Sequence, residues 1–347
     1  MGMDSKEEIM VYFGLYLKDY LENARISQTD FSNRLGITQK HMNEVLNGKK
    51  NITMEMAGNI ERLTGIDAKF IMKIENNRRI KESLLEHFET EENLIKYIKE
   101  FPINELKKRK WLVFKDESNI FQKSIDLLDF LKVKDFTVFN LLEQKVLFKK
   151  KGEDYKKLSL WIARCDQLSQ YQEVDAYNSK NFDKVIEEIK VEAYNNEIDL
   201  NNIKKILNKY GILFVVEKAL PGTKVRGVFK VNGSVPAIYL TKNYTGKDSF
   251  YFELFHELKH CKSDYNEAKN KIIANGDEKK EKEADEFALE TMINNIIWEM
   301  ILRDYKEDHI LAIADEYKIP PSFIVGRLAY NKIISYQSNL YQRYKDK

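Results

Sequence analysis

The stretch YFELFHELKH, residues 251–260, decides what the C-terminal part of the chain is built around. It contains two of the five histidines of the chain, His256 and His260, with Glu257 directly after the first. Residues four apart share one face of a helix, so both imidazoles can point at one metal ion, with Glu257 about 100° away beside it. The other positions are mostly apolar, which predicts a buried helix, and buried histidines are costly unless paired or bound to metal. The stretch therefore predicts a zinc site rather than the solvated face of an ordinary amphipathic helix.

A third metal ligand is expected downstream, because a catalytic zinc has three protein ligands and one water. In the segment EKEADEFALETM, Glu281 and Asp285 lie four residues apart on a predicted helix. One carboxylate can bind the metal while the other accepts the ring N–H of a ligand histidine and fixes the orientation of the ring. We assign these roles to Glu281 and Asp285 respectively, with Glu283 left open as an alternative ligand, and expect the cofactor to be Zn²⁺.

Three short runs rich in β-branched and aromatic residues precede this helix, at 211–217, 225–231 and 236–242. They predict three antiparallel strands, with the stretch NGS at 232–234 as a hairpin turn. Elsewhere the apolar residues recur at helical spacing. We therefore expect a mainly α protein with a small antiparallel sheet, of the α+β class.

A second constellation lies near the N-terminus, in SQTDFSNRLGITQKHMNEVLNGKKNIT, residues 27–53. Ser27 can cap one helix, Gly36 can form a tight turn, and Thr38 can cap a second helix. This is the arrangement of a helix-turn-helix, whose second helix enters the major groove of DNA. The residues expected to face DNA are Gln28, Thr38, Gln39, Lys40, Asn43, Glu44 and Lys49, with Lys50 also near the backbone.

An alternative for this N-terminal region is a helical bundle that serves only dimerisation or protein contact. Residues 1–80 carry about as many acids as bases, so phosphate neutralisation alone predicts modest affinity for DNA. Across the whole chain, 57 basic and 55 acidic residues nearly cancel, and any binding to nucleic acid must come from a local patch.

Length, cysteines and hydropathy narrow the class of protein further. A chain of 347 residues predicts two or three domains. Cys165 and Cys261 lie far apart and form no CxxC, which favours a reducing compartment, and Cys261 is expected to be a buried small apolar residue. The N-terminus has no signal-peptide pattern, and no apolar window is long enough to span a membrane. We expect a soluble, cytoplasmic protein without a membrane partner.

The segment from about residue 210 to 328 resembles the ImmA/IrrE-like zinc endopeptidases. The matching pieces are LPGTKVRG (220–227), AIYLTKNYTGKDSFYFELFHELKH (237–260), EKEADEFA (281–288) and LAIADEYKIPPSFIVGRL (311–328). HExxH followed by ExxxD is the arrangement of gluzincins such as thermolysin. Residues 14 to about 79, which begin GLYLKDYLENARISQTDFSNRLGITQ, resemble XRE-type repressors and especially HigA-type antitoxins.

These resemblances imply three parts: a helix-turn-helix DNA-binding domain at 1–79, a helical connector at 80–196 and a zinc metallopeptidase domain at 197–347. They imply a regulator that binds an operator in double-stranded DNA as a homodimer and cleaves a protein: a repressor, a toxin or itself. The alternatives are an antitoxin or transcription factor whose zinc site is structural or sensory, and a protease whose N-terminal bundle recruits a partner.

The residues then support metal-assisted hydrolysis of a peptide bond. Zinc would lower the pKa of its water, and Glu257 would take the proton and pass it to the leaving amine. We expect the strand at 237–242 to form the edge of the cleft and to hold an extended substrate by strand addition.

The sequence leaves two features of the predicted peptidase undetermined. Tyr265, Tyr305 and His309 are candidates for stabilising the oxyanion. Lys259 stands where related enzymes usually have a small residue, and its stem could restrict the cleft.

Overall fold

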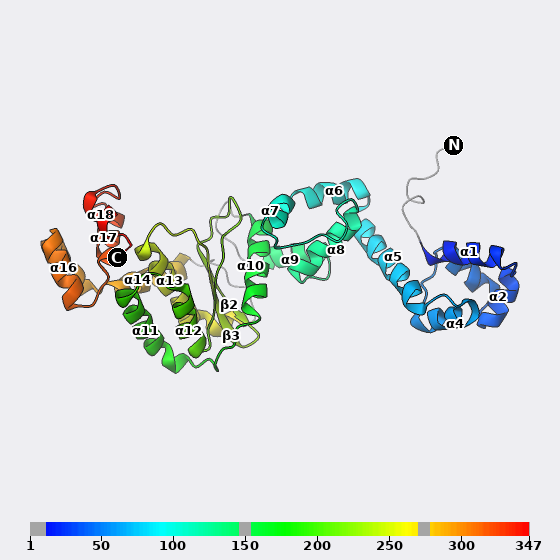
Figure 1. Ribbon diagram of the computed structural model, residues 1–347, viewed down its shortest axis with the longest axis horizontal. Coiled ribbons are helices and arrows are strands. Elements are labelled where there is room, and N and C mark those ends of the chain that lie inside the picture. The colour runs from blue at the N-terminus through cyan, green and yellow to red at the C-terminus, as the bar shows by residue number, and fades with distance from the viewer. Residues whose placement is uncertain (1–11, 146–153, 270–277, 347) are drawn as a thin grey trace. The chain divides into compact units, whose positions relative to one another are not determined.

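The chain divides into two compact units, and the computed structural model describes residues 12–145, 154–269 and 278–346 of it (Figure 1). The first unit comprises Met1–Glu100 and Phe114–Asp126, and the second comprises Phe101–Val113 and Leu127–Lys347. The expected domain boundaries, after residues 79 and 196, each fall inside a unit, so the three-part division stays a proposal.

The structure bears on two expectations about the whole chain only through the residues that it describes. Within the described ranges, no helix is both long enough and apolar enough to cross a membrane. Residues 1–11, which bear on the expectation that the chain has no signal peptide, lie outside the described residues.

The first unit is helical in its described part. Its helices are α1 (Phe13–Asn23), α2 (Gln28–Leu35), α3 (Gln39–Leu46), α4 (Met54–Thr64), α5 (Ala68–Phe88), α6 (Glu91–Lys99) and the start of α8 (Ile120–Leu131). The predicted caps are confirmed: the Ser27 hydroxyl accepts from the N–H of Asp30, and the Thr38 hydroxyl accepts from the N–H of His41. Gly36 ends α2 in the left-handed region at φ 73°, a conformation that glycine adopts without strain.

The second unit contains the remaining helices and the sheet. Its helices are α7 (Ile103–Lys108), the end of α8, α9 (Phe136–Lys145), α10 (Tyr155–Ser169), the 3₁₀ helix η1 (Ser179–Asn181), α11 (Phe182–Asn195), α12 (Leu200–Lys209), α13 (Lys247–Ala268), α14 (Glu278–Met292), α15 (Asn295–Arg303), α16 (Glu307–Glu316), α17 (Pro321–Tyr330) and α18 (Asn339–Tyr344). The strands are β1 (Leu213–Val216), β2 (Gly227–Asn232) and β3 (Val235–Leu240).

The sheet is mixed, and the expectation that all its strands are antiparallel is wrong. Its order is β1-β3-β2, with β2 and β3 forming the predicted antiparallel hairpin and β1 pairing parallel to β3. The turn of the hairpin is at Gly233, in the left-handed region. The connection from β1 runs to the far edge of the sheet before the hairpin brings β3 back beside β1. Turn residues indicate only how strands adjacent in sequence are paired, so they gave no information on the parallel pairing of β1 with β3.

Helix α13 lies at the centre of the second unit. It packs against β2, β3 and α14, and its buried residues join one hydrophobic core with residues of α11, α12 and α17. Cys261 is fully buried in this core, as expected. The helix that carries both histidines is therefore held on several sides, and its side chains have fixed positions.

Helix α10 is attached to the sheet by a polar network. The Tyr239 hydroxyl of β3 donates to Asp166 Oδ1 at 2.7 Å, and Lys230 of β2 contacts both oxygens of the same carboxylate at 2.8 Å. The Trp161 indole donates to the carbonyl of Glu217, just after β1. These bonds make α10 a structural part of the unit that contains the metal-ligand candidates.

Candidate functional site

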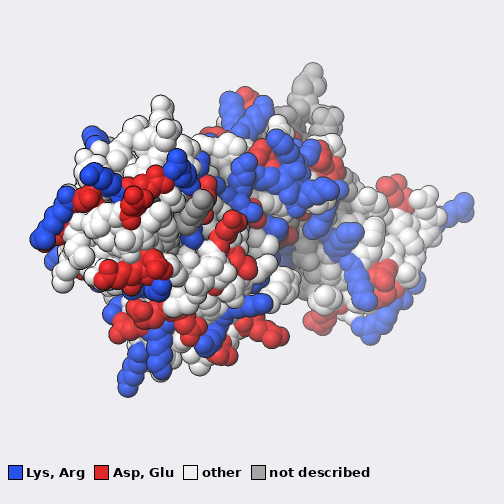
Figure 2. Space-filling view, turned by 60° about the vertical axis from the view of Figure 1, so that its left-hand side comes forward, with Lys and Arg blue, Asp and Glu red and all other residues white. Residues whose placement is uncertain are grey.

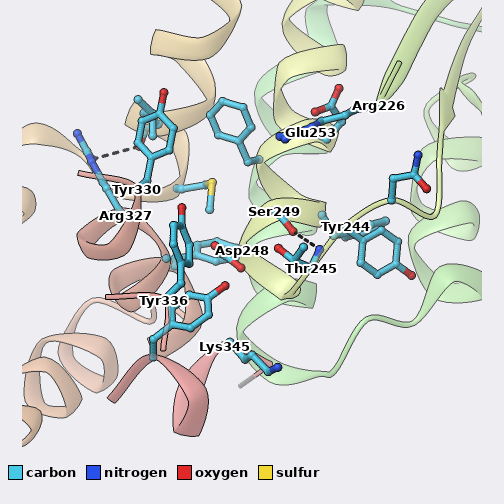
Figure 3. A pocket seen from close by; sticks show the side chains of 18 of the residues that line it. Arg226, Tyr244, Thr245, Asp248, Ser249, Glu253, Arg327, Tyr330, Tyr336 and Lys345 are labelled. Carbon is cyan, nitrogen blue, oxygen red and sulfur yellow. Dashed lines mark hydrogen bonds between the residues drawn. The ribbon is translucent and has the colours of Figure 1, made fainter. Parts of the chain in front are cut away.

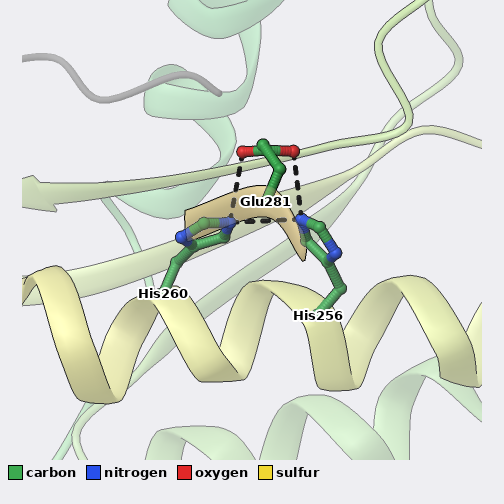
Figure 4. A group of neighbouring side chains, drawn as sticks. All are labelled: His256, His260 and Glu281. Carbon is green, nitrogen blue, oxygen red and sulfur yellow. Dashed lines mark hydrogen bonds and ion pairs between the residues drawn. The ribbon is translucent and has the colours of Figure 1, made fainter. Parts of the chain in front are cut away.

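The structure brings His256, His260 and Glu281 together in one cluster (Figure 4). The two Nε2 atoms face each other at 3.1 Å. Glu281 Oε2 lies 3.5 Å from Nε2 of His256, and its Oε1 lies 3.4 Å from Nε2 of His260. Both histidines are buried, on α13, while Glu281 projects from α14. The helical spacing places the two rings on one face, and the α13–α14 packing supplies the carboxylate.

Each ring has a carboxylate behind it. His256 Nδ1 lies 2.9 Å from Asp285 Oδ1, and His260 Nδ1 lies 2.8 Å from Asp264 Oδ2. These carboxylates accept hydrogen bonds only if the Nδ1 atoms carry the protons, which leaves both Nε2 lone pairs directed at the shared centre. Two lone pairs and a carboxylate that converge on one point are the donor set of a zinc ion. The residues present therefore fit the metal.

The charges of the cluster also favour a cation. Burial alone would lower the pKa of His256, but hydrogen bonding to Asp285 and Glu281 raises it to about 10. Burial would raise the pKa of Glu281, but the two imidazoles hold it at about 2. The neighbouring carboxylates thus attract positive charge strongly, and a divalent ion would satisfy that attraction in place of protons on the imidazoles.

Sequence reasoning missed Asp264. It is 4% exposed and also pairs with Lys280, whose Nζ lies 2.8 Å from Asp264 Oδ1. The signal was present in the sequence, because Asp264 follows His260 by four residues on the same helix. The alternative ligand Glu283 is exposed and lies 3.9 Å from Lys279, and the structure does not bring it into the cluster.

Glu257 is a completely buried residue of α13, and its carboxyl group lies against Gly227 at the start of β2. A Cβ at Gly227 would lie only 2.6 Å from Glu257 Oε1, so the glycine makes room for this carboxyl group. Neither carboxylate oxygen has a hydrogen-bond partner among the described residues. Burial raises the pKa of Glu257 to about 7. A buried carboxyl group that titrates near neutrality can accept and return a proton, which is the property of a general base.

The candidates for oxyanion stabilisation are engaged elsewhere or exposed. Tyr265 donates its hydroxyl to the carbonyl of Ser234 at 2.7 Å, in the β2–β3 turn. The His309 ring contacts the carbonyl of Asp304, and Tyr305 is 46% exposed. Within the described part of the chain, none of the three candidates hydrogen-bonds to the metal cluster. Lys259, the departure noted in the sequence, leans over the ring of Phe287, with 5.9 Å between Nζ and the ring centroid.

The expectation that the strand at 237–242 holds an extended substrate is wrong. Residues 237–240 of this segment belong to β3, which pairs with β1 on one side and with β2 on the other. Both of its edges are used, so no further strand can add to it. The outer edge of β1 is partly occupied, because the side chain of Gln172 bonds to both the N–H and the carbonyl of Phe214. The outer edge of β2, which begins at Gly227 next to Glu257, has no strand partner among the described residues.

In the first unit, the structure places most of the residues expected to face DNA on the surface. Gln28, Thr38, Gln39, Lys40, Asn43 and Lys49 are exposed, and Glu44 is half-buried. The opposite side of α3 is buried through Met42, Val45 and Leu46. Figure 2 shows both basic and acidic side chains on the face drawn, with basic side chains gathered near its upper middle.

Sequence reasoning also missed the residue that fixes the loop after α3. The Arg78 guanidinium, on α5 and 3% exposed, pairs with Glu75 at 2.7 Å and with Glu82. It also donates to the carbonyl of Gly48 at 3.2 Å and to the side chain of Asn51. Arg78 therefore holds the loop that carries Lys49 and Lys50.

Comparison with protein families locates two domains in this chain. Residues 17–71 match the family model described as helix-turn-helix, and residues 208–329 match the model of the IrrE N-terminal-like domain. Searches of curated proteins and of solved structures gave no match for the chain. The first match contains α2 and α3, and the second contains the sheet, Glu257 and all three members of the metal cluster. The chain thus joins a helix-turn-helix domain to an IrrE N-terminal-like domain of the metallopeptidase type.

Proposed function

We propose that the chain is a DNA-binding transcriptional regulator whose second unit is a zinc-dependent endopeptidase that cleaves one specific regulatory protein. The observation that carries the peptidase is the convergence of both Nε2 atoms on Glu281, with the buried Glu257 next in sequence to His256. A structural metal site has no need of an unpaired buried carboxyl group beside it, whereas a hydrolytic site needs a base there.

The metal would be held by His256 and His260 through Nε2 and by Glu281 through its carboxylate. Bound zinc supplies Lewis-acid chemistry and an activated water for hydrolysis. Asp285 and Asp264 keep the Nδ1 protons in place, so the two rings stay in the tautomer and orientation that a ligand needs. Glu257 accepts a proton on its carboxylate and returns it to the leaving amine.

The substrate would lie along the outer edge of β2 as an extended segment. That edge has no strand partner among the described residues, and Gly227 at its start touches Glu257. Main-chain hydrogen bonds to such an edge hold a peptide irrespective of its side chains. Specificity then comes from the target itself, for which we propose a repressor, a cognate toxin or the chain itself.

The DNA-binding part rests on the helix-turn-helix match and on the exposed polar face of α3. We propose that two copies bind a pseudo-palindromic operator with half-sites about one helical turn apart. Gln39, Lys40 and Asn43 would read bases, and Lys49 would contact a phosphate. The resemblance to HigA-type antitoxins suggests that the regulated gene is a neighbouring toxin gene. We propose that this regulator is cytoplasmic.

A second candidate function is a transcription factor or antitoxin whose zinc site is structural or sensory. The hydrogen bond from the Tyr265 hydroxyl to the Ser234 carbonyl favours this second function, because the hydroxyl is then not available to stabilise an oxyanion. The other two oxyanion candidates make no hydrogen bond to the cluster within the described ranges. This leaves the peptidase without an oxyanion donor among the residues considered from the sequence.

Cleavage is tested by co-expressing the chain with its genetic neighbours and measuring intact masses. The wild type, Glu257→Gln and a control, Glu286→Gln, are compared. Glu286 is an exposed glutamate of α14 that lies 3.7 Å from Lys282. We expect a new fragment with the wild type and the control but not with Glu257→Gln. The same fragment in all three samples, or in none of them, would exclude the peptidase and leave the sensory site.

A further inference from the structure

A cavity of about 660 Å³ lies in the second unit next to the metal cluster (Figure 3). It is bounded by α13, α14 and α17 and by the segment after α17. Phe252 and Glu253 of α13 line it, one turn before His256, and Leu289 of α14 lines it, one turn after Asp285. None of the three metal-ligand candidates is in its wall. The cavity therefore adjoins the metal cluster but is a separate space.

One wall of the cavity is built from residues beyond the matched peptidase-like domain. The family match ends at residue 329, and six lining residues follow it: Tyr330, Tyr336, Gln337, Tyr341, Gln342 and Lys345. This C-terminal segment is fixed in place, because the carbonyl of Lys345 accepts from the N–H of Lys247 and Arg343 pairs with Glu307 at 2.6 Å. The cavity is thus a formed site that the matched domain alone does not contain.

An acidic side chain, Asp248, lines this cavity and belongs to the first turn of α13. It is enclosed by two glycines: a Cβ at Gly246 would lie 2.8 Å from Asp248 Oδ1, and a Cβ at Gly326 would overlap the carboxyl group. Asp248 Oδ1 is buried without a hydrogen-bond partner among the described residues. Burial raises the pKa of Asp248 to about 6. A carboxyl group in these surroundings favours a positively charged or hydrogen-donating neighbour.

The basic residues of the wall do not supply that neighbour. Arg327 donates to the carbonyl of Ile293 at 2.6 Å and stacks on Trp298, with its guanidinium carbon 4.5 Å from the ring centroid. Arg226 lines the cavity close to Glu253, whose charge is opposite (Figure 3). No ion pair joins Lys345 to Asp248 in the described part of the chain. Among the residues that the structure describes, no neighbouring base therefore offsets the negative charge of Asp248.

Several of the other residues that line the cavity are aromatic. Phe323 and Tyr341 line the cavity, as do Tyr244 and Tyr336 (Figure 3). Aromatic faces attract cations, and a cavity of several hundred Å³ is the usual size for a small organic ligand rather than for one amino-acid side chain. We propose that this cavity is a binding site for a small organic cation with an apolar body, with Asp248 as its counter-ion. The site is independent of the proposed peptidase activity.

A matched series of three probes tests the proposal on the zinc-loaded full chain. Benzamidine, benzamide and benzoate have nearly the same shape but carry positive, zero and negative charge. Isothermal titration calorimetry should show benzamidine binding about tenfold or more tightly than benzamide, with benzoate weakest. No binding of benzamidine, equal binding of benzamidine and benzamide, or preference for benzoate would overturn the proposal without any variant being needed.

Variants then locate the bound cation. Asp248→Asn should reduce the affinity for benzamidine to that for benzamide. Asp308→Asn is the matched control, because Asp308 occupies the same second helical position of α16 but is exposed and does not line the cavity. Leu289→Trp, which fills the cavity from a half-buried wall position, should abolish binding. Benzamidine that binds Leu289→Trp or Asp248→Asn as it binds the wild type would place the probe elsewhere and overturn the proposal.

A final variant separates this site from the proposed peptidase. Glu257→Gln should bind benzamidine like the wild type, because Glu257 does not line the cavity. Loss of binding in Glu257→Gln would show that the probe sits at the general base instead, which overturns the cation site while leaving the peptidase proposal intact. Circular dichroism and zinc content of each variant verify that it is folded.

Discussion

The two units present their candidate functional side chains in opposite ways. In the first unit, Lys40 and Asn43 extend from the exposed side of α3, while the core is apolar apart from a few residues such as Arg78. In the second unit, His256, Glu257 and His260 are buried on α13, and Glu257 is completely inaccessible.

This difference predicts how each unit responds to substitution. Exposed recognition residues cost little to fold, because water satisfies them until DNA arrives, so their removal should affect binding alone. Buried metal ligands depend on partners for their solvation, so their removal should affect both the site and the stability of the unit around it. The following variants test that contrast, in order of decreasing effect.

The largest effect is expected for His260→Ala in the second unit. It removes one ligand and leaves Asp264 without its imidazole partner and Glu281 with only that of His256, while zinc binding contributes roughly 10 kcal/mol in other structural sites. We expect the purified variant to lose its stoichiometric zinc, measured by elemental analysis, whereas Glu257→Gln should retain about one ion per chain. Full zinc occupancy in His260→Ala would show that the ion is held by other residues.

Arg78→Ala tests a buried network of charged side chains in the first unit, which is an exception to the difference between the two units. It leaves Glu75, which is 2% exposed, without its main partner, and breaking such a buried pair costs roughly 3–5 kcal/mol. Hydrogen exchange followed by mass spectrometry should show faster exchange in α5 and in the loop at residues 47–53. The control is Arg34→Ala, which removes the exposed pair with Asp30 and should cost less than about 1 kcal/mol.

Two glycines allow the same substitution to be compared in both units. A Cβ at Gly14 would lie 2.6 Å from the carbonyl oxygen of Val45 on α3, and a Cβ at Gly227 would lie 2.6 Å from Glu257 Oε1. Overpacking of this kind costs roughly 1–3 kcal/mol. We expect Gly14→Ala to weaken DNA binding by displacing α3, and Gly227→Ala to abolish cleavage while zinc is retained.

The control for both is Gly58→Ala on α4, where an added Cβ meets no atom within 4 Å and the helix should gain about 1 kcal/mol. Unfolding in urea measures the stability of the three variants. If Gly227→Ala is as active and as stable as Gly58→Ala, the close approach of Gly227 to Glu257 has no functional importance.

The smallest effects are expected at the surface of the first unit. Lys40→Ala should cost roughly 1–3 kcal/mol in operator affinity and relax specificity at one base pair, without a change in unfolding. Lys49→Ala should weaken all sequences alike and lower the salt dependence of binding by about one unit of slope. Selection from random DNA followed by fluorescence anisotropy measures both. An absence of any enriched motif would favour a bundle that recruits a protein partner.

Features that depend on local geometry could be predicted from the sequence alone. Ser27 and Thr38 precede helices whose first turns need a hydrogen-bond acceptor, and both act as caps in the structure. The i, i+4 spacing of His256 and His260 places both rings on one face of any helix they occupy. The same local rule would have found Asp264, because it lies four residues after His260.

What the tertiary structure alone decided are the features that join residues distant in sequence. Strand β3 lies between β1 and β2 because it pairs parallel to β1, and no turn residue in the sequence indicates this pairing. As a result, the edge of the sheet without a strand partner belongs to β2 and not to β3. The room for Glu257 depends on Gly227, 30 residues earlier in the chain. The enclosure of Asp248 depends on Gly326 and on the C-terminal wall of the cavity. Such contacts leave no periodic trace in a sequence, because they are set by how the elements pack and not by the order of residues within any one of them.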